Sequence, residues 1–377
     1  MEFIDLATQQ KRIIEKIETN IKSVLNHGKY IMGPEVKILE DKLANYVGAK
    51  HAVSCASGTD ALLMALMAYK VGQGDAVFTT PFTFIATAEV ISLLGATPVF
   101  VDIDPDTYNI DPQKLEQTIK KTKLTGNALH PKVIIAVDLF GLTADYDAIK
   151  KIARDHNLIV IEDAAQSFGA DYKGKKSCSF GDIACTSFFP AKPLGCYGDG
   201  GMCFTNNTEI ETIIKSIRLH GQGEHKYDNV RIGINGRIDT IQAAILLAKF
   251  DIFPEEIKLR QEAAARYSKL LSPIAFLKTP QIPERYQSAW AQYSILAKNE
   301  KQREIILAAL SKEKIPSAIY YPKPLHQQEA FSFLGYKKGD FPVSEDAAAR
   351  IFSLPMHPYL KMEDQQKIAN VLGNALR

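Results

Sequence analysis

Short apolar runs alternate along the chain with segments in which apolar and polar residues repeat with the period of a helix. The runs are rich in strand-forming residues and lie at residues 76–79, 98–101, 133–137 and 158–161. Residues Tyr146 to His156 show the helical pattern instead. Strands and helices that alternate in this way are typical of a mostly parallel sheet covered by helices. We therefore predict an α/β fold.

The second part of the chain is predicted to begin a separate unit. Helical patterns at residues 240–249 and 255–271 are interrupted at Phe253-Pro254, and proline is compatible with the start of a helix but not with its interior. We predict a large domain at residues 1–250 and a smaller α+β domain at residues 251–377.

Composition excludes several classes of function. The 377 residues are 46% hydrophobic and 23% charged, which suffices for a large buried core. Lys and Arg (45) nearly balance Asp and Glu (43) and form no long basic block, so no nucleic-acid partner is expected. The five cysteines contain no CxxC pair, which indicates neither a zinc ribbon nor a disulfide framework and favours a reducing compartment.

The sequence predicts a cytoplasmic protein without a membrane partner. Acidic residues occur between Met1 and Leu6, where a signal peptide has a basic start and an apolar run. The longest mainly apolar stretch, Ile91 to Val101, contains Gly95 and Pro98 and is shorter than the ~20 residues of a bilayer span. We interpret this stretch as helix, turn and strand.

Lys192 and Asp163 are the first candidates for catalysis. Lys192 lies in the segment SFFPAKPLG, and Asp163 follows an apolar run in IVIEDAAQS. A lysine forms a Schiff base with the aldehyde of pyridoxal phosphate, and a buried aspartate at a strand end keeps the pyridine nitrogen protonated. Taken singly, Lys192 fits a surface lysine and Asp163 a strand-end cap. Together they indicate a pyridoxal phosphate enzyme.

A third segment, SCASGTDAL at residues 54–62, reads as a strand, a turn of small residues and a helix start. Backbone N–H groups at a helix N-terminus, with the Thr59 hydroxyl beside them, can bind a phosphate group. Gly58 and Thr59 are therefore candidates for the phosphate site. Taken alone, the segment is more typical of plain helix capping than of phosphate binding.

Six motifs follow one another in the order found in a known enzyme family. They are Gly33–Val36, Ser57–Leu62, Pro81–Thr87, Glu162–Ser167, the Lys192 segment and Asn235–Asp239. With them the chain resembles, nearly end to end, the fold-type I pyridoxal phosphate enzymes and, within these, the DegT family of sugar-nucleotide aminotransferases. Residues Cys196–Gly201 resemble the branch that aminates the 3-oxo position of a UDP-linked N-acetylated glucuronic acid.

The resemblance implies roles around the cofactor ring. Lys192 would hold the cofactor and, as a free amine, move a proton between the donor Cα and the cofactor C4′. Asp163 would keep the pyridine nitrogen charged. Phe84 matches the residue whose ring stacks on the cofactor, and Gln166 the residue that bonds its phenolic oxygen. A core phenylalanine and a loop-capping glutamine are the structural alternatives.

The resemblance also implies a shared phosphate site. Ser187 matches the family's phosphate-binding hydroxyl and would act with Gly58 and Thr59. Asn235 matches an asparagine that reaches the cofactor phosphate in the neighbouring subunit, which implies a homodimer with shared active sites.

Substrate contacts are carried over in the same way. Arg237 would pair with a substrate carboxylate, for which a planar guanidinium is suited; an interface or capping arginine is the alternative. Tyr320 and Tyr321 lie in a segment, residues 319–326, predicted to be a strand lining the sugar site. Relatives commonly carry histidine where Tyr320 stands, and tyrosine cannot carry a positive charge near neutral pH. Lys29 and Tyr30 are candidates for contacts with the nucleotide sugar.

The remaining features are expected to be structural. Asp102–Asp106 is predicted to be a turn and not a metal site. His220 and His357 are not needed as catalytic groups, since Lys192 supplies the base. The polar stretch Lys120 to Pro131 is predicted to be a surface loop without an assigned function.

The function expected from the resemblance is transfer of an amino group from L-glutamate to a UDP-linked 3-oxo-2-acetamido-2-deoxy-glucuronic acid, for surface polysaccharide precursors such as lipopolysaccharide O-antigen. A 4-oxo or 3-oxo 6-deoxy sugar nucleotide is the alternative substrate. A related dehydratase would carry histidine in place of Lys192. A regulator that binds the cofactor without catalysis is a further alternative.

Overall fold

A seven-stranded, mostly parallel sheet forms the centre of the computed structural model, which describes residues 1–124 and 129–375. Its strand order is β1-β9-β8-β5-β4-β2-β3, and only β9 runs antiparallel to its neighbours. The strands are β1 (His51–Cys55), β2 (Asp75–Thr79), β3 (Thr97–Phe100), β4 (His130–Val137), β5 (Ile159–Asp163), β8 (Ile183–Ser187) and β9 (Gly201–Thr205). The predicted α/β architecture is confirmed.

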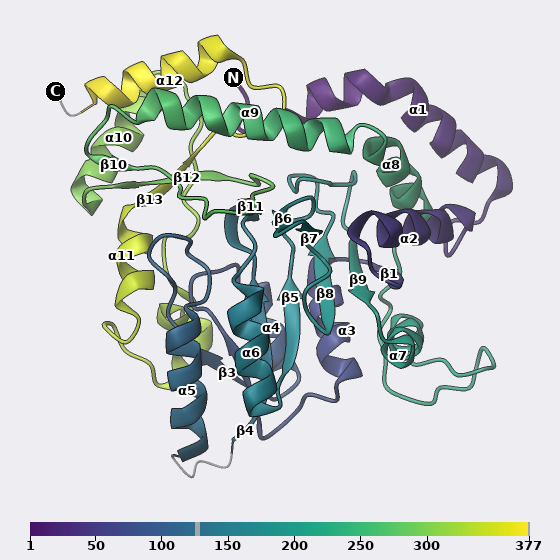
Figure 1. Cartoon of the computed structure of the whole chain (residues 1–377). Coiled ribbons are helices and arrows are strands. Elements are labelled where there is room, and N and C mark those ends of the chain that lie inside the picture. Colours follow the sequence, from purple (N-terminus) through teal and green to yellow (C-terminus); the bar gives the residue numbers. More distant parts are fainter. Residues whose placement is uncertain (125–128, 376–377) are drawn as a thin grey trace.

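Helices cover both faces of this sheet (Figure 1). In the large part of the chain they are α1 (Leu6–His27), α2 (Pro34–Val47), α3 (Gly58–Ala68), α4 (Ala86–Leu93), α5 (Pro112–Leu124), α6 (Tyr146–His156), α7 (Thr208–Arg218) and α8 (Thr240–Phe250). Val133 and Ile135 of β4 pack with α3, α4 and α7, whereas Ile134 and Ala136 pack with α5 and α6. Because both faces are buried, the strands read as continuous apolar runs.

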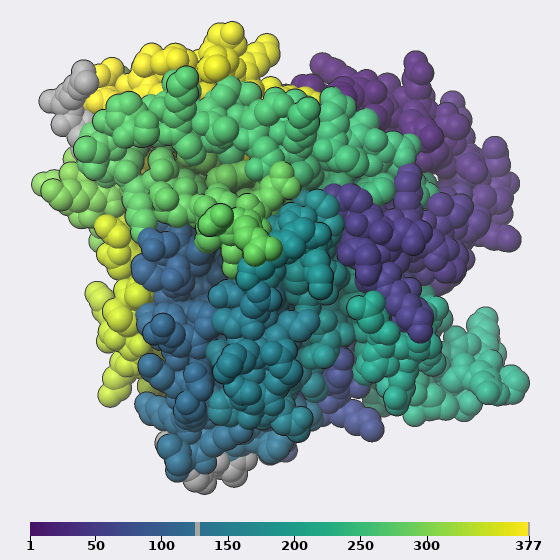
Figure 2. Space-filling view, in the orientation of Figure 1, coloured from purple at the N-terminus to yellow at the C-terminus, as the bar shows by residue number. Residues whose placement is uncertain are grey.

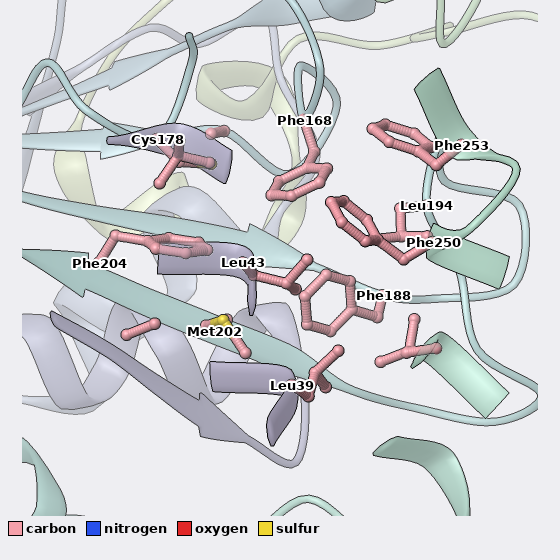
Figure 3. Close-up of a cluster of buried hydrophobic side chains, with 14 of the residues drawn as sticks. Leu39, Leu43, Phe168, Cys178, Phe188, Leu194, Met202, Phe204, Phe250 and Phe253 are labelled. Atoms are coloured by element: carbon pink, nitrogen blue, oxygen red, sulfur yellow. The ribbon is translucent and has the colours of Figure 1, made fainter. Parts of the chain in front are cut away.

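A cluster of large side chains supports the segment that carries Lys192. Phe188 and Leu194 lie on either side of that lysine in sequence, and both are at most 1% exposed. Figure 3 shows them among Leu39 of α2, Phe250 of α8 and Phe168. Burial of two anchors so close to Lys192 fixes the backbone between them, because each would lose ~2 kcal/mol on exposure.

The C-terminal part builds a second sheet of order β10-β12-β13. Its elements are α9 (Phe253–Leu271), β10 (Leu277–Lys278), β12 (Tyr293–Ala297), α10 (Glu300–Lys312), α11 (Pro342–Arg350), β13 (Ile351–Leu354) and α12 (Met362–Asn374), with short 3-10 turns at Leu325–Gln327 and Glu329–Leu334. A further 3-10 turn, Leu139–Gly141, follows β4 in the large part of the chain. Pro254 stands in the first turn of α9. The division at residues 250 and 251 stays a prediction.

A third, small sheet connects the two parts of the chain. β11 (Tyr286–Gln287) pairs with β6 (Asp171–Tyr172), which pairs with β7 (Lys175–Lys176). The space-filling view shows the surface of the C-terminal part in continuous contact with the N-terminal helices along one side of the molecule (Figure 2). Among residues 1–124 and 129–375, the structure contains no helix with the length and apolar character needed to cross a membrane.

The prediction of a surface loop at residues 120–131 is wrong at both ends of that range. Lys120 to Leu124 complete α5, and β4 already begins at His130. The helix continues because it needs only Leu115 and Ile119 to face the core, and its polar residues stay in solvent. The rest of the prediction falls partly on residues 125–128, which lie outside the described residues.

Candidate active site at the carboxyl edge of the sheet

The predicted catalytic residues meet at one edge of the central sheet. β5 ends at Asp163 and β8 ends at Ser187, and the two strands are parallel. β1 runs in the same direction, since both β1 and β8 are antiparallel to β9. Carboxyl ends of parallel strands therefore bring Asp163, Ser187 and the start of α3 together, at the edge where open α/β sheets bind ligands.

Asp163 is held in a fixed orientation by two donors. Its side chain is 5% exposed. The Thr87 hydroxyl donates to Oδ2 at 2.8 Å and the Ala165 N–H donates to Oδ1 at 3.2 Å. Burial raises the pKa of this carboxyl, while the two hydrogen bonds and the charge of Lys192 act in the opposite direction.

Lys192 lies close enough to Asp163 for the two charges to interact. Its side chain keeps partial contact with solvent, but its surroundings are dense, and burial lowers the pKa of the amine while Asp163 raises it. A lowered pKa leaves more of the amine unprotonated near neutral pH, and the unprotonated amine is the nucleophilic form.

The start of α3 forms a tight cradle against the end of β8. Ser57 caps the helix, since its hydroxyl accepts from the Asp60 N–H at 3.0 Å. The N–H groups of Gly58 and Thr59 precede the first intrahelical donors and stay available to a ligand. A Cβ at Gly58 would lie 2.7 Å from the Ser187 Cβ, so only glycine allows the two segments this approach.

Phe84 departs from its structural alternative, whereas Gln166 agrees with its own, because its side chain caps the backbone of the turn that contains Phe140. Phe84 is 56% exposed, so its interpretation as a core residue is wrong. Gln166 is 4% exposed, and its Oε1 accepts from the Phe140 N–H at 2.8 Å. Its Nε2 donates to the Tyr321 hydroxyl at 3.2 Å, so Gln166 links the large part of the chain to residue 321.

Tyr320 and Tyr321 do not lie in a strand. In the described chain, residues 317–324 have no regular strand beyond a single bridge between Ala318 and Ser353. Pro322 and Pro324 lack the N–H groups that a strand ladder needs, which explains the wrong prediction. The Tyr320 ring lies 6.4 Å from the ring of Phe3, a contact that sequence spacing does not indicate.

Asn235 is the last residue of a projecting arm, residues 219–235, which is visible beyond α7 in Figure 1, and Arg237 follows it. Asn235 is exposed, and the Gly236 carbonyl accepts from the N–H of Ala56, two residues before Gly58. The Nε atom of Arg237 is buried without a hydrogen-bond partner among the described residues. The Nε atoms of Arg218, Arg260, Arg303 and Arg350 are buried without a partner in the same way in the described part of the chain, so this atom alone does not indicate a ligand.

Lys29 and Tyr30 are exposed and lie beside the same segment. The Tyr30 carbonyl accepts from the Thr240 N–H at 2.9 Å, and Ile31 forms a bridge with Asp239. These backbone contacts bring Lys29 and Tyr30 close to Arg237 in space, although about 200 positions separate them in sequence.

Other acidic residues at strand ends serve the fold. Asp102 accepts from the backbone N–H groups of Val343 and Ser344 at the start of α11. Asp138 is fully buried and accepts from the Tyr146 and Ser167 hydroxyls. Asp104 accepts from two backbone N–H groups in a turn, as predicted, and no cluster of metal-ligand residues occurs among the described residues.

The two histidines also differ in environment. His220 is exposed at the base of the arm, whereas His357 is buried against Arg260 and Asp5. Neither histidine is among the groups that shift the pKa of Lys192 or of Asp163, in agreement with a structural role.

The donor set at this edge matches the chemistry of pyridoxal phosphate. A helix start with a neighbouring hydroxyl suits a phosphate group, a partly neutral amine suits an aldehyde carbon, and a buried carboxylate suits a protonated ring nitrogen. These come from the start of α3 with Ser187, from Lys192 and from Asp163 respectively.

Comparison with known proteins gives one consistent result. The model of the DegT/DnrJ/EryC1/StrS aminotransferase family matches residues 11–373. A Pseudomonas aeruginosa protein named UDP-2-acetamido-2-deoxy-3-oxo-D-glucuronate aminotransferase is 51% identical, across 99% of this chain and 100% of that protein. A Geobacillus stearothermophilus protein named pleiotropic regulatory protein is 42% identical, across 99% and 98% respectively. A crystal structure of a DegT DnrJ EryC1 StrS aminotransferase from Brucella abortus has a TM-score of 0.95 and 51% identity, covering 99% of this chain and 98% of that one.

Proposed function

The chain belongs to the DegT/DnrJ/EryC1/StrS aminotransferase family, and on this basis we propose that it transfers an amino group from L-glutamate to a UDP-linked 2-acetamido-2-deoxy-3-oxo-glucuronic acid. The protein is a pyridoxal phosphate-dependent sugar-nucleotide aminotransferase. The proposal includes a cytoplasmic location and a role in making precursors of a surface polysaccharide such as O-antigen. The name of the P. aeruginosa relative supports the choice of sugar.

The observation that carries the proposal is the Lys192 amine beside the Asp163 carboxylate at the sheet edge. Pyridoxal phosphate, when bound, supplies an aldehyde carbon that takes up the amino group and a ring that accepts electrons. Lys192 holds that carbon and, once released, carries a proton to and from the substrate carbon. Its lowered pKa favours the neutral amine that both tasks require.

Asp163 and the α3 cradle orient the site around Lys192. With the cofactor bound, Asp163 would hold a proton on the ring nitrogen, because a buried carboxylate stabilises an adjacent cation. The N–H groups of Gly58 and Thr59, with the Ser187 hydroxyl, would bind the phosphate at the positive end of the helix dipole. Phe84 would stack on the ring, and Gln166 would bond its phenolic oxygen.

A second copy of the chain completes the site in this proposal. The arm exposes large apolar side chains, with Tyr227 87% and Ile232 85% exposed, which favours burial against another molecule. Asn235 then reaches the partner's phosphate site. Arg237 would pair through its guanidinium with the uronate carboxylate, beside Tyr320, Tyr321, Lys29 and Tyr30.

A regulator without catalysis is the second candidate, and the name of the G. stearothermophilus relative is the observation in its favour. The two candidates differ in whether glutamate reacts. An enzyme consumes glutamate in the first half-reaction, whereas a regulator leaves both glutamate and the cofactor unchanged.

The test follows the visible absorption band of the cofactor-loaded protein. L-Glutamate is expected to remove the band, and the UDP-linked 3-oxo uronic acid is expected to restore it. Lys192→Ala is the matched control, because it removes the amine that both half-reactions need. If glutamate removes the band and only a 6-deoxy oxo-sugar restores it, the uronate assignment is wrong. If glutamate has no effect, the regulator is favoured or the donor is another amino acid.

A further inference from the structure

A chain of two hydroxyl groups leads to Asp163 from the side of α4. The hydroxyls of Thr83 and Thr87 lie 3.2 Å apart, and Thr87 Oγ1 lies 2.8 Å from Asp163 Oδ2. All three residues are at most 5% exposed. Thr87 stands in the first turn of α4, and its β-branched side chain has few rotamers, so the hydroxyl position is fixed.

The direction of the chain follows from counting protons. A hydroxyl has one proton to donate, and an ionised carboxylate can only accept. The Thr87 hydroxyl therefore donates a hydrogen bond to Asp163 and accepts one from the Thr83 hydroxyl. Each hydrogen bond in such a chain polarises the next, which strengthens the donation to the carboxylate.

The charges around Asp163 make this donor important. The titratable groups whose charges couple to Asp163 are Lys192, Cys185, Tyr146 and Tyr321. Burial raises the pKa of Cys185, Tyr146 and Tyr321, so these three groups are neutral near neutral pH. Lys192 is the cation that lowers the pKa of Asp163, but burial lowers the pKa of Lys192 itself.

The charge on Lys192 is also not constant during the proposed reaction, because the same nitrogen binds the cofactor and carries protons. The Thr87 hydroxyl and the Ala165 N–H keep their protons at every stage. They are therefore the donors from this chain that support an ionised Asp163 when Lys192 is neutral.

We propose that Thr87 is a positioning residue that keeps Asp163 ionised and oriented throughout the reaction, with Thr83 supporting it from behind. This inference rests on the proposed role of Asp163 at the ring nitrogen. Thr87 acts through Asp163 and has no contact of its own with the reacting atoms.

The experiment compares Thr87→Val, which keeps the shape and removes the donor, with Thr87→Ser, which keeps the donor. Infrared difference spectra of the cofactor-free protein follow the protonated carboxyl band against pH, after subtraction of the same protein carrying Asp163→Asn. The midpoint is expected at higher pH in Thr87→Val than in the wild type, unchanged in Thr87→Ser, and moved less in Thr83→Val. Pyridoxal phosphate is expected to bind Thr87→Val about tenfold more weakly at pH 8.

A wild-type midpoint in Thr87→Val, with a wild-type circular dichroism spectrum, would overturn the inference. If Thr87→Val does not fold, Thr87→Ala replaces it, because alanine also lacks the hydroxyl donor; a wild-type midpoint there has the same meaning. The titration contains neither cofactor nor glutamate. If the midpoint shifts in Thr87→Val while the wild-type protein fails to react with glutamate, the role of Thr87 is supported and the proposed function is contradicted.

Discussion

Replacement of Gly58 by alanine tests the phosphate cradle directly. The new Cβ would lie 2.7 Å from the Ser187 Cβ and 3.2 Å from the Ser187 Cα and Oγ. Because the Cα is part of the backbone, rotation of the serine side chain cannot relieve all of these contacts. The start of α3 and the end of β8 must therefore move apart.

The magnitude follows from the size of that movement. Ordinary contacts between such atoms need a separation of about 3.4 to 4 Å, so the segments must shift by roughly 1 Å. Overpacking of this kind costs about 1–3 kcal/mol of folding free energy. The same shift carries the N–H groups of Gly58 and Thr59 away from the phosphate, and loss of one charge-assisted hydrogen bond weakens binding about tenfold or more.

The assay measures the melting temperature of the cofactor-free protein and the dissociation constant for pyridoxal phosphate by equilibrium dialysis. Gly72→Ala is the control, because a Cβ there meets its nearest atom, the Leu94 carbonyl oxygen, at 3.8 Å. We expect Gly58→Ala to lose stability and affinity while Gly72→Ala loses neither by a comparable amount. Wild-type affinity in a destabilised Gly58→Ala would refute the placement of the phosphate at this helix start.

Three further outcomes are expected. Phe84→Ala should raise the dissociation constant of the cofactor about fivefold, from the loss of ~1 kcal/mol of ring stacking, with little change in melting temperature because the ring is 56% exposed; unchanged affinity by dialysis would contradict the stacking role. Arg237→Ala should reduce kcat/KM for the uronate sugar about tenfold or more and spare a 6-deoxy oxo-sugar, so equal losses on both sugars in steady-state kinetics would argue against a carboxylate contact. Burial and the charge of Arg260 lower the pKa of His357 from 6.5 to about 4, so the unfolded chain binds a proton more readily than the folded protein. Up to about 3 kcal/mol of the free energy of unfolding should therefore be lost as pH falls from 6.5 to 4. Urea unfolding at both pH values checks this, and His357→Gln should reduce the difference between them.

Local patterns predicted β2, β3, β4 and β5 of the large sheet, whereas no strand was predicted at β8. Helix α6 spans Tyr146–His156, the range that its apolar periodicity indicates, and the stretch Ile91 to Val101 is helix, turn and strand. Both segments pack on a sheet that is buried on two faces, so their own sequences carry the signal. The carboxyl-end positions of Asp163 and Ser187 follow from the same parallel arrangement.

The parts that were missed depend on contacts between residues far apart in sequence. Thr87 is 76 positions from Asp163, and the contact between Phe3 and Tyr320 spans most of the chain, so no local spacing indicates either contact. Thr87 stands in the motif that also contains Phe84, and its hydroxyl was the available signal. The 56% exposure of Phe84 could not be inferred from the local pattern either, because a phenylalanine among apolar neighbours is usually predicted to be buried in the core.

The pairing of β11 with β6 limits how the molecule can move. Tyr286 pairs with Tyr172, and further backbone hydrogen bonds join Ala289 to Gly141 and Leu325 to Pro81, so the segments on either side of residue 250 are fastened at several separate places. A rigid-body swing about a single hinge would break all of these bonds at once. Any closing movement of the C-terminal part over the sheet edge therefore has to deform these connections together, so large domain swings are energetically disfavoured.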